Sequence, residues 1–205
     1  RAMCLTTALP QLASATATTA WRWHSCRKAK HYPQFERPDQ MKSMKLKTSL
    51  ALAMGFLAAT GAQAETKTAV FGGGCFWCTE ADFDKVPGVL KTISGYAGGQ
   101  YKDPDYKVVS AGKTDHTEVV EVTYDDTKVS YSELVEYFWK TIDPTVKNRQ
   151  FCDSGTQYRS GFYYLNDEQK KIAEASKARL QASGKFKTIH TEVAPVVKFY
   201  PAEEY

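Results

Sequence analysis

The spacing of hydrophobic and polar residues changes repeatedly after residue 65, and each change marks a predicted element. Short stretches of alternating, β-branched or aromatic residues predict strands, whereas apolar residues three or four positions apart predict one face of a helix. Strands are predicted at residues 68–71, 89–97, 117–124, 161–165 and 190–197. Helices are predicted at residues 75–85, 130–142 and 166–183. The predicted order is therefore β-α-β-β-α-β-α-β.

Turn and capping residues support these boundaries. Three glycines at 72–74 end the first strand, and Ser130 with Glu133 has the sequence of a capping box. Asn166 is the expected N-cap of the last helix, and Gly184 follows its final turn. The mixture of adjacent strands and strand–helix alternation predicts an α+β fold. We expect a two-layer sandwich with a mixed, ferredoxin-like central sheet and long active-site loops.

Residues 44–64 have the pattern of a secretory signal peptide. Two lysines open the segment, residues 50–59 are apolar, and Ala62-Gln63-Ala64 ends it. The apolar run is shorter than the ~20 residues with which a helix spans a bilayer. A buried core helix is the alternative interpretation. A signal peptide predicts a periplasmic or secreted protein that is not membrane-bound after cleavage, whereas a chain without one would be cytoplasmic.

The rest of the chain divides at this predicted cleavage site. Residues 65–205 are enough for one catalytic domain with its own core. Residues 1–43 precede the predicted start, Met44, and show no sustained period. We expect them to be a disordered, non-native or upstream extension, with a transit peptide as the alternative. Their cysteines and histidines match no zinc-site spacing, although they include Cys4, His24, Cys26 and His31.

Composition and charge exclude several classes of protein. The chain has 205 residues, of which 42% are hydrophobic and 24% charged, which argues against disordered, collagen-like and coiled-coil proteins. The net charge of +4 divides into +7 over residues 1–64 and −3 over residues 65–205. The predicted domain is therefore slightly acidic, and its charge gives no indication of nucleic-acid binding.

The most informative segment lies between the first predicted strand and helix. Cys75 follows three glycines, which allow a sharp turn and a close approach of substrate. It falls at a helix N-terminus, where we expect the helix dipole to lower the pKa of the thiol and favour the nucleophilic thiolate. Phe76 and Trp77 can line an apolar pocket beside it, and Cys78 completes a C-x-x-C motif that allows a redox couple.

Two other interpretations of these cysteines stay open at this point. Cys75 and Cys78 can be inert core thiols, since free cysteine is often buried. They can also form a metal site together with Cys152 and His116. The aromatic residues inside the C-x-x-C motif leave little room for a tetrahedral set of ligands, so we predict no metal.

The motif Gly74-Cys75-Phe76-Trp77 resembles the signature of the A-type peptide methionine sulfoxide reductases. Further segments between residues 68 and 205 resemble this family in the same order. They are Pro87-Gly88-Val89, Gly95-Tyr96-Ala97-Gly98-Gly99, Asp103-Pro104-Asp105-Tyr106, His116-Thr117-Glu118, Asp153-Ser154-Gly155-Thr156-Gln157-Tyr158-Arg159 and Phe199-Tyr200-Pro201-Ala202-Glu203-Glu204-Tyr205. The resemblance implies a peptide-methionine (S)-S-oxide reductase, an oxidoreductase that repairs proteins after oxidative damage.

The resemblance also implies a role for each site residue. Cys75 would attack the sulfoxide sulfur and become a sulfenic acid, in a pocket where Phe76 and Trp77 hold the methyl group. Glu118 would be the acid that protonates the departing oxygen, because a carboxyl group between apolar walls keeps its proton near neutral pH. The remaining site residues would polarise the S=O bond, directly for Tyr106 and Tyr158 and through water for Asp153.

Recycling requires a second thiol. The sulfenic acid would condense with Cys78 or Cys152 to a disulfide, and Cys78 is preferred because of its proximity in sequence. An external thioredoxin-like dithiol would then reduce the disulfide, so no bound cofactor is expected. The expected partners are oxidised proteins, peptides or free methionine sulfoxide and this reductant, and the enzyme is expected to be a monomer. The family often carries recycling cysteines in a C-terminal tail, and we expect the chain to stop short of it at Tyr205.

Some features leave room for other functions. Asp115 replaces a glycine that usually precedes the His-Thr-Glu segment in the family, so the local turn can differ. A general thiol–disulfide oxidoreductase would also use Cys75 and Cys78, but thioredoxin-type sites lack the downstream carboxylates and tyrosines. A non-catalytic metal-binding module is the other alternative. Taken singly, Glu118 would be a solvent-facing charge on a strand, so its predicted role depends on the joint pattern.

Overall fold

The computed structural model describes residues 65–203 of the chain. The predicted extension at 1–43 and the predicted signal peptide at 44–64 lie outside the described residues. These residues form the predicted catalytic domain. No helix within residues 65–203 is long and apolar enough to cross a membrane.

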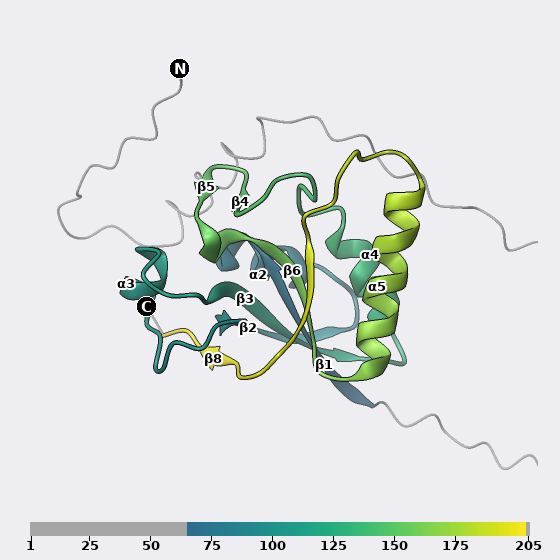
Figure 1. The fold of residues 1–205 in the computed structure, drawn as a ribbon. Coiled ribbons are helices and arrows are strands. Elements are labelled where there is room, and N and C mark those ends of the chain that lie inside the picture. Colours follow the sequence, from purple (N-terminus) through teal and green to yellow (C-terminus); the bar gives the residue numbers. More distant parts are fainter. Residues whose placement is uncertain (1–64, 204–205) are drawn as a thin grey trace, which may run out of the picture. The chain divides into compact units, whose positions relative to one another are not determined.

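A six-stranded sheet in the order β7-β6-β1-β3-β2-β8 forms the centre of this domain (Figure 1). Neighbouring strands pair antiparallel, except for β6 and β7, which are parallel. The strands are β1 (Thr66–Gly73), β2 (Val89–Ala97), β3 (Thr117–Asp125), β6 (Ser160–Tyr164), β7 (Glu192–Pro195) and β8 (Tyr200–Pro201). The predicted α+β fold with a mixed sheet is confirmed.

Four helices and a small hairpin accompany the sheet. They are α2 (Phe76–Phe83), α3 (Tyr106–Ser110), α4 (Tyr131–Phe138), α5 (Asp167–Ala182) and the hairpin of β4 (Arg149–Gln150) with β5 (Asp153–Ser154), which is followed by the 3₁₀ turn η1 (Thr156–Tyr158). The predicted caps are present. The Ser130 hydroxyl accepts a hydrogen bond from the Glu133 N–H in a capping box, and the Asn166 side chain accepts one from the Gln169 N–H.

The structure differs from the sequence prediction in short elements. The helix predicted at 130–142 ends at Phe138, because the N–H groups of Lys140 and Thr141 bond to carbonyls only three residues back and tighten the chain. The short helix α3 was not predicted, since it follows a Gly- and Asp-rich loop and has a single turn of apolar periodicity. Its N-cap is Asp105, whose carboxylate accepts from the Val108 N–H.

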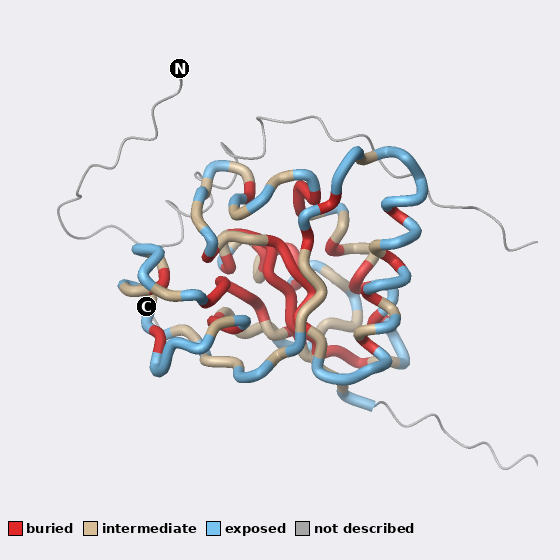
Figure 2. The backbone as a smooth tube through the Cα atoms, in the orientation of Figure 1, coloured by how far each residue is buried: buried red, intermediate tan, exposed pale blue. Residues whose placement is uncertain are grey.

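The main core lies between one face of the sheet and helices α2, α4 and α5. Phe71 of β1 is fully buried at its centre and contacts Phe83 at 4.6 Å, Phe138 at 5.2 Å and Phe162 at 6.0 Å between ring centroids. These rings come from one strand and two helices besides β1, so aromatic packing fixes the layers against one another. Figure 2 shows the buried backbone concentrated in the central strands.

A second, smaller cluster lies on the opposite face of the sheet. It comprises Val70, Ala97, Val119 and Tyr163, and Val196 and Phe199 of the C-terminal segment pack against it. The C-terminal segment then adds β8 to the edge of the sheet beside β2. The end of β1 leads into α2, where Trp77 of α2 stacks on Tyr106 of α3 and Gln150 of the hairpin lies against Gly74.

Candidate active site

Cys75 lies where β1 turns into α2. Gly74 makes this turn with φ +91°, and a Cβ atom there would lie 2.5 Å from the Cβ atom of Gln150. Gln150 is itself fixed, because its side chain accepts from the Asp143 N–H at 2.8 Å and donates to the Asp143 carbonyl at 2.9 Å. Glycine is therefore required at position 74. Sequence reasoning missed Gln150, since a single glutamine in a polar loop carries no pattern.

The Cys75 thiol occupies the N-cap position of α2 and is half-buried. A hydrogen bond with Cys78 and then burial raise the pKa of the Cys75 thiol, and the charge of Asp153 raises it further. The expected lowering of this pKa by the helix dipole is therefore wrong for this state of the site. Burial and the nearby Cys78 and Asp153 side chains destabilise the Cys75 thiolate. This effect is larger than the stabilisation by the dipole of the eight-residue helix α2. Cys75 is thus a protonated thiol at neutral pH.

Glu118 lies next to Cys75 although the two are far apart in sequence. Its side chain projects from β3 and is 1% exposed, and its Oε2 accepts a hydrogen bond of 3.1 Å from the Phe76 N–H. Burial raises the pKa of Glu118 to about 8, and the charges of Cys75 and Asp153 add to this, against the opposing effect of the Phe76 N–H. Glu118 is therefore protonated at neutral pH, and its carboxyl group is bonded to the residue that directly follows Cys75.

An aromatic wall adjoins Cys75. Phe76 is buried, and its ring centroid lies 5.4 Å from Trp77 and 6.1 Å from Tyr106. The Trp77 ring stacks on Tyr106 at 5.6 Å and is 40% exposed, so the wall is open on one side. Tyr96 supports Phe76 from behind at 5.8 Å. Residues from α2, β2 and α3 thus provide an apolar surface beside the thiol.

Tyr158 and Asp153 approach from the segment that contains the hairpin and η1. Burial raises the pKa of the Tyr158 hydroxyl, followed by the charges of Glu118 and Asp153 and, more weakly, those of Tyr106 and Cys75. Tyr158 therefore keeps its proton and can donate a hydrogen bond. The charged groups that shift the pKa of Tyr158 are all predicted site residues, so the fold brings these residues close to one another.

The two other cysteines of the domain have different surroundings. Cys78 lies one turn after Cys75 and is half-buried, and both residues are thiols in the structure. Cys152 is exposed, next to Asp153 after β4, and is disulfide-bonded. The thiol that contacts Cys75 is thus that of Cys78.

His116, which was considered as a metal ligand, instead contacts the loop at Tyr101 and the C-terminal strand at Tyr200. It is fully buried, and its Nε2 lies 2.8 Å from the Tyr101 carbonyl, while its ring meets Tyr200 edge-on at 5.4 Å. Among residues 65–203 there is no group of three His, Cys, Asp or Glu side chains placed to hold a metal ion.

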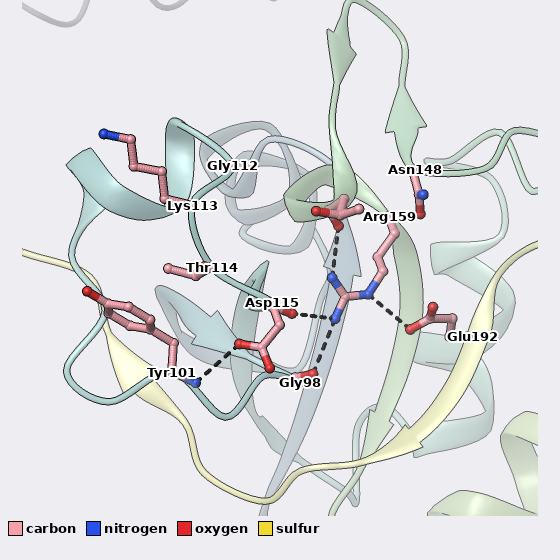
Figure 3. A pocket seen from close by; sticks show the side chains of 10 residues that line it. Gly98, Tyr101, Gly112, Lys113, Thr114, Asp115, Asn148, Arg159 and Glu192 are labelled. Carbon is pink, nitrogen blue, oxygen red and sulfur yellow. Dashed lines mark hydrogen bonds and ion pairs between the residues drawn. The ribbon is translucent and has the colours of Figure 1, made fainter.

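A hollow of about 950 Å³ lies between the loops that flank α3 and the segment around Arg159 (Figure 3). Arg159 is at its centre, with its guanidinium group directed at several backbone carbonyls (Figure 3). The residues that line it are Gly98, Tyr101, Gly112, Lys113, Thr114, Asp115, Asn148, Thr156, Arg159 and Glu192. None of the predicted catalytic residues belongs to this set, so the hollow is separate from the Cys75 site.

Relatives of known name match the same domain. A protein family model described as peptide methionine sulfoxide reductase matches residues 67–205. The peptide methionine sulfoxide reductase MsrA of Listeria monocytogenes serotype 4b (strain CLIP80459) is 52% identical over 138 residues, which is 67% of this chain and 78% of that protein.

Solved structures match with the same fold. Mxr1 from Saccharomyces cerevisiae in reduced form matches with a TM-score of 0.64 and 36% identity, over 68% of this chain and 81% of that one. Methionine sulfoxide reductase A of Corynebacterium diphtheriae matches with a TM-score of 0.60 and 38% identity, over 69% and 72%. Mxr1 in complex with Trx2 matches with a TM-score of 0.50 and 25% identity, over 66% and 79%. The resemblance seen in the sequence is confirmed, and the chain belongs to the peptide methionine sulfoxide reductase family.

Proposed function

We propose that the chain reduces methionine-S-sulfoxide, free or in proteins, to methionine, with Cys75 as nucleophile and Glu118 as general acid. The observation that carries these two roles is the position of the Glu118 carboxyl group, which is hydrogen-bonded to the Phe76 N–H beside Cys75 and has its pKa raised to about 8. Family membership supports the reaction, and a protonated carboxyl group supplies the acid that it requires.

The reductive step transfers one oxygen atom. Glu118 donates its proton to the sulfoxide oxygen while the sulfur of Cys75 attacks the sulfoxide sulfur. The protonated oxygen then moves to the Cys75 sulfur, as the original S–O bond and the transient bond between the two sulfur atoms both break. The thiol proton of Cys75 replaces the one that Glu118 has given up, so the step converts a thiol and a sulfoxide into a sulfenic acid and methionine. Protonation of the oxygen and loss of the thiol proton are thus coupled, which removes the need for a resting thiolate.

The neighbouring side chains bind and polarise the sulfoxide. The rings of Phe76, Trp77 and Tyr106 offer an apolar surface to its methyl group, and the open side next to Trp77 admits a methionine side chain that projects from a protein. The Tyr158 hydroxyl, whose proton is retained, would donate to the S=O oxygen together with that of Tyr106. Asp153 would act through a water molecule.

Recycling uses Cys78 in this proposal. Its thiol is hydrogen-bonded with Cys75, so it can attack the sulfenic sulfur, form a Cys75–Cys78 disulfide and release the oxygen as water. A thioredoxin-like dithiol would then reduce the disulfide. The complex of Mxr1 with Trx2 supports such a donor, because that structural relative assembles with a thioredoxin-like protein. No bound cofactor takes part in these steps.

The sequence of residues 44–64 supports export, and we include it in the proposal. A signal peptide would place a monomeric enzyme in the periplasm or outside the cell, where the reductant must also be an exported thioredoxin-like protein.

The function is tested with the two separated epimers of methionine sulfoxide and dithiothreitol as reductant. We expect the chain to release methionine from the S epimer and not from the R epimer. A folded chain, verified by circular dichroism, that reduces insulin disulfides but neither epimer would contradict the proposal and favour a general thiol–disulfide oxidoreductase.

A further inference from the structure

The guanidinium group of Arg159 joins parts of the chain that are distant in sequence. Its Nη1 donates to the Thr156 carbonyl at 2.9 Å, and its Nη2 donates to the carbonyls of Gly98 at 3.3 Å and Asp115 at 3.1 Å (Figure 3). The Arg159 side chain is only 14% exposed. The Nε atom donates a fourth hydrogen bond, to Glu192 Oε2 at 3.1 Å.

Each of the three carbonyls lies in or just before an element that carries a proposed site residue. Gly98 directly follows β2 and opens the loop that leads to Tyr106 at the start of α3. Asp115 lies three residues before Glu118, and Thr156 begins the 3₁₀ turn that contains Tyr158. Arg159 is thus bonded to the backbone of segments that lead into or form the elements carrying Tyr106, Glu118 and Tyr158.

The first two loops are also bonded to each other. The Asp115 carboxylate accepts from the N–H groups of Gln100 at 2.7 Å and Tyr101 at 3.1 Å, and these bonds lower the pKa of Asp115. The side chain of Asp115 therefore fixes the loop whose start Arg159 holds, while its carbonyl binds Arg159 itself. The departure from glycine at position 115 adds a connection that a glycine cannot make.

The chemistry of this contact requires arginine. A guanidinium group has five N–H donors in a planar fork, whereas a lysine ammonium group is a compact point charge with three donors and cannot reach three fixed carbonyls and a carboxylate at once. The charge is paired with Glu192 of β7, which offsets the cost of holding a cation where it is 14% exposed. Glu192 also sets the rotation of the fork by binding Nε.

We propose that Arg159, oriented by Glu192, is a positioning residue for sulfoxide reduction, which aligns the segments that lead to Tyr106, Glu118 and Tyr158. The inference rests on the proposed function. Arg159 contacts no substrate atom in this proposal and takes part in no chemical step. Its effect is expected on the alignment of the acid and the hydroxyl donors with the sulfoxide, and alignment errors of ~1 Å cost on the order of 100-fold in rate.

The test compares Arg159→Met, Arg159→Lys and Glu192→Gln with the matched control Arg179→Met. Arg179 lies on α5, is 61% exposed and pairs with Glu136 away from the site. We expect Arg159→Met to lower kcat for the S epimer by about 100-fold with a smaller change in KM, and Arg159→Lys to lower it nearly as much. Added methylguanidinium should restore part of the rate of Arg159→Met, and Arg179→Met should stay within about twofold of the parent chain.

The outcomes separate this inference from the function on which it rests. A parent chain that reduces neither epimer contradicts the proposed function. An active parent with an Arg159→Met variant that melts at lower temperature but keeps its kcat overturns the inference, because Arg159 would then only stabilise the fold. If Arg159→Met does not fold, Glu192→Gln decides: a several-fold loss of kcat in a folded variant supports the inference, and an unchanged kcat overturns it.

Discussion

At the scale of single residues, the environment shared by Cys75 and Glu118 sets the protonation of both. The Cys78 hydrogen bond and burial raise the pKa of Cys75, burial and the charge of Cys75 raise that of Glu118, and the charge of Asp153 raises both. A thiol and a carboxyl group that both hold protons are an unusual resting state for a nucleophile and an acid, but they suit a reaction in which one proton is delivered as another is lost. The Phe76 N–H holds the carboxyl group in place meanwhile.

Replacing Glu118 by Gln tests the acid. Glutamine keeps the carbonyl oxygen that accepts from the Phe76 N–H but has no acidic proton. We expect the rate of methionine release in a single turnover to fall by about 100- to 10,000-fold. The parent rate should decline above about pH 8, where Glu118 ionises, and this decline should be absent in the variant.

The matched control is Glu121→Gln, since Glu121 lies on the same strand β3. Its single-turnover rate should stay within about twofold of the parent chain. An unchanged rate in Glu118→Gln would assign the acid to another residue.

Replacing Cys78 by Ser tests recycling. With a thioredoxin-like donor as the only reductant, Cys78→Ser should release one methionine per enzyme molecule and then stop, because no disulfide forms for the donor to reduce. Cys75→Ser should release none. Counting methionine against enzyme measures both results.

Cys152→Ser serves as the companion variant and is expected to turn over continuously. If Cys152→Ser stops after one methionine while Cys78→Ser continues, the second thiol is Cys152.

At the scale of elements, the turn from β1 to α2 depends on the absence of a side chain at Gly74. Gly74→Ala should destabilise the domain by more than the ~1–2 kcal/mol that a left-handed backbone costs an ordinary residue, because the new Cβ also meets Gln150. It should also lower kcat, since the displaced backbone carries Cys75. Denaturant unfolding and steady-state kinetics measure the two effects.

Gly184→Ala is the control for backbone strain alone. Gly184 has φ +69° and no atom within 4 Å of its Cβ position. Its variant should lose only the ~1–2 kcal/mol and keep its kcat. Equal losses for the two variants would show that Gln150 gives way to the added methyl group.

The sequence was a good guide to elements with a repeated pattern. The β-branched and aromatic runs of β1 and β3, the alternating pattern of β2 and the cap residues Ser130 and Asn166 predicted their elements, because strand propensity and local hydrogen bonds depend on residues close in sequence. The short elements α3 and β8 were missed, since five or two residues contain too little period. The prediction of a lowered Cys75 pKa was wrong because two of the effects that raise it, burial and the charge of Asp153, come from segments that only the fold brings near.

At the scale of the whole domain, the two faces of the sheet carry different parts of the site. The helix face holds the aromatic core and the thiol, and the other face holds Arg159, Tyr163 and the returning C-terminal segment. That segment also reaches the site wall, because the Glu203 carboxylate accepts from the Tyr106 N–H at 3.0 Å and from the Tyr96 hydroxyl at 3.1 Å. Site geometry is thus a property of the complete domain rather than of the motif around Cys75.

Stability of the whole domain should depend on pH through Glu118. The folded chain binds its proton up to about pH 8, whereas the unfolded chain loses it near 4.5, so the folded state binds more protons between these values. The free energy of unfolding contributed by this residue therefore falls as pH rises from about 4.5 to about 8, by up to ~5 kcal/mol. Thermal unfolding of the parent chain and Glu118→Gln measures it.

The two chains should differ least near pH 5, and the variant should become the more stable one as pH approaches 8. A constant difference across this range would mean that Glu118 ionises at its ordinary pKa in the folded protein.

The protonated state of Cys75 has a further consequence for a repair enzyme. Peroxide and alkylating reagents attack thiolates far faster than thiols. A nucleophile that stays protonated until a sulfoxide meets the proton of Glu118 is shielded from indiscriminate oxidation to sulfinic acid. We therefore expect the chain to remain active in the oxidising conditions that produce its substrates, with its reactivity reserved for the damaged side chain.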